Sequence, residues 1–331
     1  MKKRILSGMR PTGPLHIGHL AGALKNWVRL QDEYECYFMI ADWHALMSEY
    51  EDPKLIKDYT IEMMLDWMSC GIDINKSVLF VQSHIPEHLE LYMAFSLLTP
   101  LGWLERNPTY KEQLREIKGR DLTTYAFLGY PVLQAADIAL YKANAVPVGE
   151  DQLPHLELTR EILRRLHRLY GKNIFPEPEA LLTDTPKLLG LDNRKMSKSY
   201  NNFIAINENP DEIRKKVQRM ITDPERIKLS DKGHPHTCTV FSYYKAFASE
   251  SDLKEVEQYC KNAHKGCTEC KKMMADLLIE CLSPIREKRK WLKENFQERV
   301  LAPWSECLKK ANDVAQKTMS EVKDILHIYE I

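Results

Sequence analysis

Apolar runs and amphipathic stretches alternate along the first half of the chain. Short strands are predicted at 4–6, 36–41 and 77–82, and the last two are continuous apolar runs typical of buried parallel strands. Helices are predicted at about 18–30 and 52–70, and a further helix begins at Pro86. This β-α-β-α-β order predicts a parallel sheet with helices on both faces and ligands at the carboxyl ends of its strands.

The pattern continues with a helix at 131–143, a strand at 145–148, a helix at 152–170 and a proline-rich connector at 175–178. After about Asn209, apolar residues recur at helical spacing, and Lys and Glu fill the other face. We therefore expect two domains, namely a Rossmann-type α/β domain over residues 1–200 and an all-helical domain over residues 201–331.

Composition indicates a globular protein outside the membrane. Hydrophobic residues make up 44% of the chain and charged residues 28%. No apolar run approaches the ~20 residues of a membrane span, and no apolar segment of a signal peptide follows the basic N-terminus. We expect a cytoplasmic protein.

Charge and cysteine content narrow the chemistry. Lys plus Arg and Asp plus Glu both number 47, which excludes a strongly basic nucleic-acid-binding domain but leaves room for local basic stripes. In the absence of a secretion signal, eight cysteines indicate metal or redox chemistry rather than a disulfide framework.

Residues 11–19, Pro-Thr-Gly-Pro-Leu-His-Ile-Gly-His, follow the first strand and open the first helix. Free backbone N–H groups and the helix dipole favour phosphate at such a position. His16 and His19 lie three residues apart, so both imidazoles can face one ligand and donate to phosphate oxygens. Taken alone, this segment is a weak motif, and the alternative is a helix start whose histidines are merely exposed.

A second motif, Lys-Met-Ser-Lys-Ser at 195–199, lies in a polar stretch at the predicted domain junction. Two ammonium groups on flexible stems can follow a departing pyrophosphate. Alone it would be an ordinary solvated loop, but paired with the first motif it indicates a nucleotide site.

The two motifs together resemble the signatures of the class I aminoacyl-tRNA synthetases. The rest of the chain resembles the bacterial tryptophanyl-tRNA synthetase family over nearly its whole length, most specifically at 130–138, 146–152 and 156–160. The resemblance implies a homodimeric ligase that activates L-tryptophan with Mg²⁺-bound ATP. It then transfers the amino acid to the 3′ end of tRNA(Trp), whose anticodon the helical domain reads.

The resemblance also assigns roles to residues. Asp137 would accept the indole N–H, and a buried acid on an apolar helix otherwise has little reason to be there. The tryptophan site implied in this way comprises Ser7, His44, Tyr130, Gln134, Asp137 and Gln152. The ATP site comprises Arg10, Pro11, Thr12, Gly18, His19, Gly149, Glu150, Asp151, Leu188, Lys195, Met196, Ser197, Lys198 and Ser199. The groups that stabilise charge during catalysis are His16, His19, Lys111, Lys195 and Lys198.

Alternative functions remain within and outside the fold. A tyrosyl enzyme shares both signatures, but the first strand carries Leu6 and Ser7 where a tyrosine would meet the phenolic hydroxyl, so tryptophan is favoured. A non-catalytic, cluster-bearing RNA-binding protein on this fold would not need the set His16, His19, Lys195, Lys198 and Asp137. Against a nucleotidyltransferase acting on another carboxylate stand Asp137 and the anticodon-type helical domain.

Four cysteines of the predicted helical domain form a separate group: Cys238, Cys260, Cys267 and Cys270. Four thiolates suit tetrahedral zinc or a [4Fe–4S] cluster. A subset of bacterial tryptophanyl enzymes carries a similar run and binds a [4Fe–4S] cluster there, so the resemblance implies the cluster, with zinc or free thiols as alternatives. We expect it to brace the anticodon-binding surface.

The remaining cysteines, Cys36, Cys70, Cys281 and Cys307, fall on apolar periodic positions and are predicted to be small core residues. The basic stretch 286–291 is either a tRNA contact or a solvated helix face.

Overall fold

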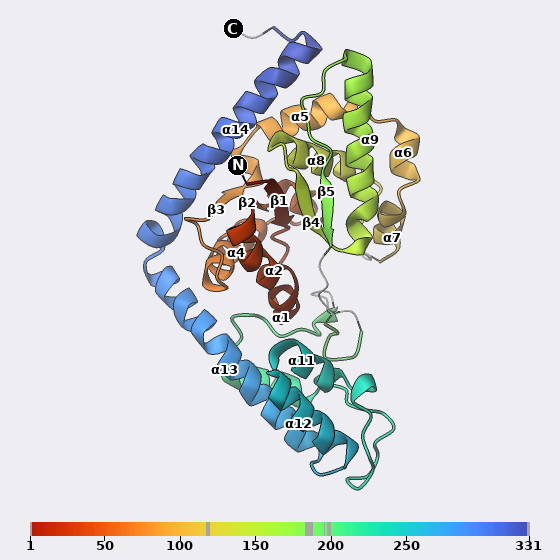
Figure 1. Cartoon of the computed structure of the whole chain (residues 1–331), viewed down its shortest axis with the longest axis vertical. Coiled ribbons are helices and arrows are strands. Elements are labelled where there is room, and N and C mark those ends of the chain that lie inside the picture. Colours follow the sequence, from red (N-terminus) through yellow and green to blue (C-terminus); the bar gives the residue numbers. More distant parts are fainter. Residues whose placement is uncertain (1, 117–119, 183–187, 195, 197–199, 330–331) are drawn as a thin grey trace.

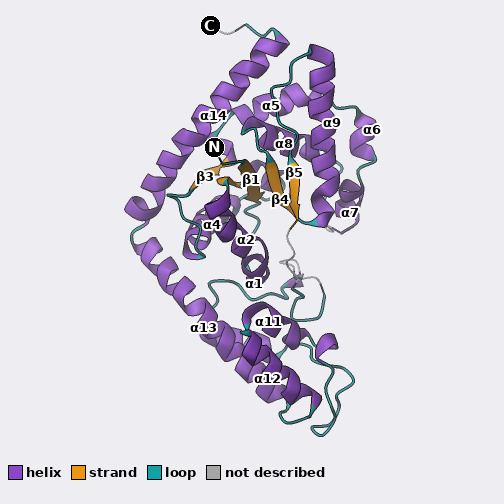
Figure 2. Cartoon of the chain, in the orientation of Figure 1, coloured by secondary structure: helices purple, strands orange, loops and turns teal. Residues whose placement is uncertain are grey.

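The structure is a computed structural model that describes residues 2–116, 120–182, 188–194, 196 and 200–329. Its centre is a five-stranded sheet in which all neighbouring strands are parallel. The strands are β1 (Arg4–Met9), β2 (Glu35–Ile40), β3 (Ser77–Val81), β4 (Ala145–Val148) and β5 (Glu179–Leu182). The predicted Rossmann-type architecture is thus confirmed, and all five strands lie in one part of the molecule (Figure 2).

The strand order β3-β2-β1-β4-β5 reverses direction at β1. The chain first builds outward to β3 and then returns to add β4 on the other side of β1. The carboxyl ends of β1 and β4 therefore flank a topological switch point, where helices leave in opposite directions and open a crevice for a ligand.

Helices cover both faces of the sheet because successive strand residues point to opposite sides. On one face, Ile5 and Phe38 pack against α2 (Lys25–Glu33) and α4 (Ile56–Ser69). On the other, Leu6 and Tyr37 pack against α5 (Glu87–Ser96), α8 (Tyr125–Leu140) and α9 (Leu153–Tyr170). Helices α1 (Ile17–His19) and α2 are joined by a π-helical turn at Leu20–Leu24 and form one continuous helix. Three shorter helices complete this part of the chain: α3 (Asp42–Glu49), α6 (Leu101–Glu105) and α7 (Pro108–Glu116).

In the described part of the chain, β5 is the last strand of the sheet, and helices make up the regular structure that follows it (Figure 1). They are α10 (Pro210–Gln218), α11 (Thr239–Phe247), α12 (Glu250–Lys261), α13 (Cys267–Glu294) and α14 (Ala302–Leu326). Helix α13 contacts α10, α11 and also α4 of the sheet-bearing part. After a π-helical turn at Gln297–Leu301, α14 returns along β3, α5 and α8.

Several elements differ from the prediction. Strand β1 continues to Met9 because Gly8 and Met9 pair with Met39 and Ile40 of β2. Helix α8 begins at Tyr125 rather than at 131, and Pro131 lies inside it. Helix α3 and strand β5 were not predicted. Among the described residues, no helix is long and apolar enough to cross a membrane.

Candidate active site at the carboxyl edge of the sheet

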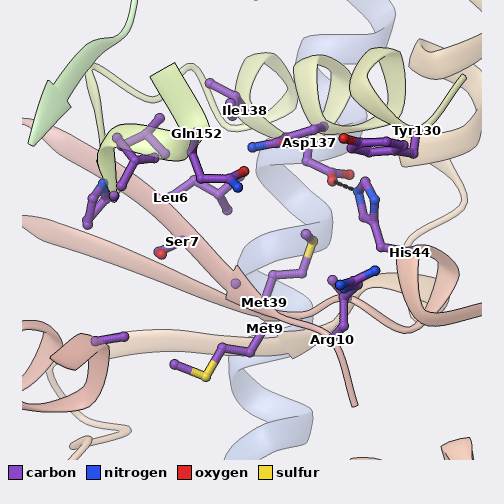
Figure 3. A pocket seen from close by; sticks show the side chains of 18 of the residues that line it. Leu6, Ser7, Met9, Arg10, Met39, His44, Tyr130, Asp137, Ile138 and Gln152 are labelled. Carbon is purple, nitrogen blue, oxygen red and sulfur yellow. Dashed lines mark hydrogen bonds and ion pairs between the residues drawn. The ribbon is translucent and has the colours of Figure 1, made fainter. Parts of the chain in front are cut away.

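A cavity of about 640 Å³ opens at the carboxyl ends of β1 and β4, at the switch point (Figure 3). Its wall includes ten of the residues that the sequence assigned to the two substrates: Ser7, Arg10, His19, His44, Tyr130, Gln134, Asp137, Gly149, Asp151 and Gln152. Apolar side chains such as Leu6, Met39 and Val146 complete the lining. One cavity thus collects residues from β1, α3, α8 and the turn after β4.

The carboxylate of Asp137 is the most strongly held polar group in the wall. Asp137 lies on α8 and is only 2% exposed. Its Oδ2 accepts from His44 Nε2 at 2.7 Å, and its Oδ1 accepts from Gln82 Nε2 at 2.8 Å and from His88 Nδ1 at 2.6 Å. Burial raises the pKa of Asp137, but the two histidines outweigh burial and lower it to about 2. The carboxylate is therefore ionised at neutral pH.

The hydroxyl of Tyr130 is oriented by a second buried histidine. Asn107 Oδ1 accepts from the backbone N–H of Thr109, so the amide nitrogen of Asn107 faces His155 Nδ1, 3.1 Å away. Burial lowers the pKa of His155 to about 4, so the ring is neutral with its hydrogen on Nε2. That nitrogen donates to the Tyr130 oxygen at 2.8 Å. The Tyr130 hydrogen is left to donate to another acceptor.

The first signature motif packs against the segment that follows the second. Residues on either side of His16 bond to the backbone at 204–206: Ile17 N donates to Ile204 O and Ile206 N donates to Leu15 O, both at 3.0 Å. The rings of His16 and His19 contact each other at a tilt of 35°, with centroids 3.7 Å apart. His19 lines the cavity, whereas His16 is buried.

Gly18 lies where the two signatures meet. A Cβ at this position would come within 2.9 Å of His16 Nδ1 and 3.1 Å of the buried Met196 sulfur. Met196, the residue of the second motif that the structure describes, therefore packs against the first motif. Lys195, Ser197, Lys198 and Ser199 fall outside the described residues.

The other described residues of the predicted nucleotide and catalytic sets, apart from Met196 and the residues already placed, are not among those that line the cavity. Thr12 follows the buried Pro11 and donates its N–H to Arg10 O. Glu150 lies in the short 3-10 helix Glu150–Gln152, and Leu188 packs partly buried against the core. Lys111 is exposed on α7. Of the predicted ATP set, the structure therefore places Arg10, His19, Gly149 and Asp151 in the cavity wall.

A second, small cavity among the later helices is lined by all four cysteines of the predicted cluster, Cys238, Cys260, Cys267 and Cys270. Burial raises the pKa of the Cys270 thiol to about 12 and also raises the pKa values of Cys238 and Cys260. Within the described part of the chain, no three His, Cys, Asp or Glu side chains are arranged to hold one metal ion. The cluster stays a prediction.

The other four cysteines divide into two pairs. Cys36 and Cys307 are buried core residues, as expected, whereas Cys70 and Cys281 are only partly buried.

Comparison with known proteins identifies the family. The sequence model described as "tRNA synthetases class I (W and Y)" matches residues 1–283. The tryptophan–tRNA ligase of Thermotoga maritima is 50% identical, over 98% of this chain and 99% of that protein. The tryptophan–tRNA ligase of Aquifex aeolicus is 43% identical, over 98% of this chain and 100% of that protein. The chain belongs to the tryptophanyl-tRNA synthetase family.

Solved structures agree with this membership. The tryptophanyl-tRNA synthetase of Campylobacter jejuni, complexed with ADP and tryptophan, superposes with a TM-score of 0.89 at 33% identity, covering 98% of this chain and 99% of that one. The tyrosyl-tRNA synthetase of Archaeoglobus fulgidus, complexed with L-tyrosine, has a TM-score of 0.67 at 20% identity, covering 87% of this chain and 90% of that one. At that identity the tyrosyl enzyme shares the fold alone.

Sequence reasoning missed Gln82, His88, Asn107 and His155, which hold the polar groups of this synthetase cavity in place. Gln82 directly follows β3, and a polar residue at the carboxyl end of a buried strand is a readable signal. The other three lie on segments whose approach to α8 no local pattern shows.

Proposed function

We propose that this protein is a cytoplasmic tryptophan–tRNA ligase whose substrates meet in the cavity at the sheet edge. The observation that carries the proposal is an ionised, buried Asp137 in the wall of that cavity, in a chain whose relatives are tryptophan–tRNA ligases. In the first step L-tryptophan and Mg²⁺-bound ATP give tryptophanyl-adenylate and pyrophosphate. In the second, the amino acid passes to the 3′ end of tRNA(Trp).

The tryptophan subsite combines one carboxylate with apolar walls. Asp137 would accept the indole N–H, while Leu6, Met39 and Val146 would enclose the ring. Ser7, His44, Tyr130, Gln134 and Gln152 also line the cavity and would contact the rest of the amino acid. Because the first strand carries the buried, apolar Leu6 and no tyrosine to meet a phenolic hydroxyl, the pocket supports tryptophan over tyrosine.

The ATP subsite would lie along the first signature. Arg10, Pro11, Thr12 and Gly18 would contact ATP from the turn and helix start, where free N–H groups favour phosphate. His16, His19, Lys111, Lys195 and Lys198 would stabilise the charge that develops on the phosphates. Gly149, Glu150 and Asp151 would hold the ribose and adenine, together with Leu188 and the segment of Met196, Ser197 and Ser199.

The chemistry is an in-line displacement in which positioning and charge stabilisation dominate. A tryptophan carboxylate oxygen forms a bond to the α-phosphorus as the bond to the β-phosphate oxygen breaks. A ribose hydroxyl of the tRNA 3′ end, the 2′-hydroxyl in class I enzymes, then attacks the carbonyl carbon, and AMP leaves.

Pyrophosphate exchange with each of the twenty amino acids tests this function. We expect pyrophosphate exchange that depends on tryptophan. Exchange with tyrosine alone would refute the assignment of the pocket to tryptophan. Asp137→Ala should lose tryptophan binding while ATP binding persists, and unchanged tryptophan affinity would contradict the indole assignment.

The division into a catalytic part, residues 1–200, and a tRNA-binding part, residues 201–331, belongs to this proposal. Within the basic stretch 286–291, Lys288 and Lys290 are exposed and available to phosphates, whereas Arg289 is buried in ion pairs. A homodimer is supported by exposed apolar side chains of α5 and α6, among them Met93, Leu97 and Leu101.

We further propose that Cys238, Cys260, Cys267 and Cys270 hold a structural [4Fe–4S] cluster, as in a subset of the family, with zinc as the alternative. The proposal is supported by the chemistry of four thiols that line one cavity, while the described residues do not present three of them arranged around one metal ion. Anaerobic purification followed by iron and sulfide analysis should find the cluster. Stoichiometric zinc without visible absorbance would overturn it.

A further inference from the structure

Two buried polar side chains, His88 and Tyr141, stand behind the Asp137 carboxylate. His88, near the start of α5, is fully buried, and Tyr141 follows the end of α8. His88 Nδ1 lies 2.6 Å from Asp137 Oδ1, and His88 Nε2 lies 2.8 Å from the Tyr141 hydroxyl. This chain of hydrogen bonds links Asp137 to the core between α5 and α8.

The hydrogens of this chain have one consistent arrangement for a neutral ring. An ionised carboxylate only accepts, so His88 Nδ1 carries a hydrogen and donates to Asp137. Burial raises the pKa of Tyr141, which therefore keeps its proton and donates to His88 Nε2. The tautomer of His88 is thus determined from both sides.

The donors around Asp137 fill some of the lone-pair positions of its carboxylate and leave one unfilled. A carboxylate offers about four lone-pair positions, two on each oxygen. Gln82 and His88, both fully buried, occupy the two on Oδ1, and His44 occupies one on Oδ2. His44 lines the cavity, so the oxygen with a remaining position is the one on the cavity side.

We infer that His88 is a positioning residue for tryptophan selectivity: by occupying Oδ1 it directs the unfilled position of Asp137 Oδ2 at the substrate's ring N–H. The inference rests on the proposed function and names what orients its indole acceptor. His88 does not touch the substrate. Without its N–H, Asp137 Oδ1 loses one of two donors, and only Gln82 and His44 still restrain rotation of the carboxylate about its Cβ–Cγ bond.

A substrate pair isolates the indole hydrogen bond. In β-(3-benzothienyl)alanine, sulfur replaces the N–H of tryptophan with little change in shape. The ratio of kcat/KM for tryptophan to kcat/KM for this analogue, measured by pyrophosphate exchange, reports the bond to Asp137. Loss of general packing lowers both values and leaves their ratio unchanged.

Two variants of His88 separate its donor from its bulk. His88→Asn places an amide N–H near the position of Nδ1, so we expect the ratio to stay near the wild-type value. His88→Gln reaches toward Tyr141 instead, so we expect the ratio to fall about tenfold or more, the equivalent of losing about 1.4 kcal/mol of discrimination. Both variants keep a polar side chain in the buried site, and KM for ATP should not change in either.

His84→Asn is the matched control, because His84 is exposed in the short helix Gln82–His84 and should leave the ratio unchanged. The inference is overturned if His88→Gln keeps the wild-type ratio or if both His88 variants lower it equally. Failure of the proposed function looks different, since the wild-type protein would then show no tryptophan-dependent exchange.

Discussion

At the scale of single residues, buried histidines hold the polar side chains of the cavity in place. His88 and His44 donate to Asp137, and His155 donates to Tyr130. His88 and His155 are fully buried, so every polar atom on them must find a partner within the protein. Each histidine ring is held in place and donates a hydrogen bond in one direction to a polar side chain of the cavity wall.

The neutral state of His155 predicts a pH-dependent stability. The pKa of His155 is about 4 in the folded protein against 6.5 for an unperturbed histidine, so the unfolded chain binds more protons between these values. The free energy of unfolding should therefore fall as the pH drops from about 6.5 to about 4, by on the order of 3 kcal/mol from this group. Asp137 affects the free energy of unfolding only below this pH range, because the stability that its ionised form provides is lost as the pH falls toward about 2.

Urea unfolding across this pH range measures the effect. The His155→Gln variant should lose the slope that belongs to His155, while His167→Gln, an exposed histidine on the same helix, should keep it. Equal slopes for wild type and His155→Gln would show that His155 is charged or solvated in the folded protein.

At the scale of elements, the pattern of apolar and polar residues located the strongly apolar segments. It missed the segments whose structure depends on contacts with other parts of the chain. Strands β2, β3 and β4 were predicted almost to the residue, because each is a compact apolar run. Strand β5 is short and only partly buried, and it is a strand because its backbone pairs with β4. Helix α3 directly follows an apolar strand with no break in composition, and the Asp42 carboxylate that accepts from Trp43 N marks its start.

Helix α8 shows how tertiary contacts override a local signal. The sequence pattern predicts that the helix starts at Pro131, but in the structure the Thr124 side chain caps the helix by accepting from Phe127 N. Gly129 then lets α5 approach closely, since a Cβ there would lie 2.4 Å from the Tyr92 hydroxyl oxygen. Tyr130 and Asp137 both lie on this helix and line the cavity.

At the scale of the whole molecule, a buried ion pair ties the later helices to the sheet. Arg289 of α13 donates to Asp66 of α4 at 2.6 Å and also pairs with Glu62. Asp66 is nearly fully buried and also accepts a backbone hydrogen bond from Leu15, the residue before His16. The first signature, α4 and α13 are therefore connected through one carboxylate.

Removing Arg289 should destabilise the protein strongly. Arg289→Met leaves Asp66 buried and without its ion-pair partner, so the free energy of unfolding should fall by about 3–5 kcal/mol. Arg214→Met is the control, because Arg214 pairs with Asp276 at an exposed site and its loss should cost no more than about 1 kcal/mol. Urea unfolding compares the two, and similar small losses would mean that solvent reaches Asp66.

Sequence alone determined the parallel sheet, the two nucleotide signatures and Asp137 as a buried acid. Each of these depends on spacing within one stretch of chain, where periodicity and the properties of a helix start apply directly. Only the tertiary structure decided that Gln82 and His88 donate to Asp137 and that Arg289 serves an ion pair and not a phosphate. These arrangements join residues far apart in sequence, and they depend on how whole helices pack, which no local pattern of apolar and polar positions contains.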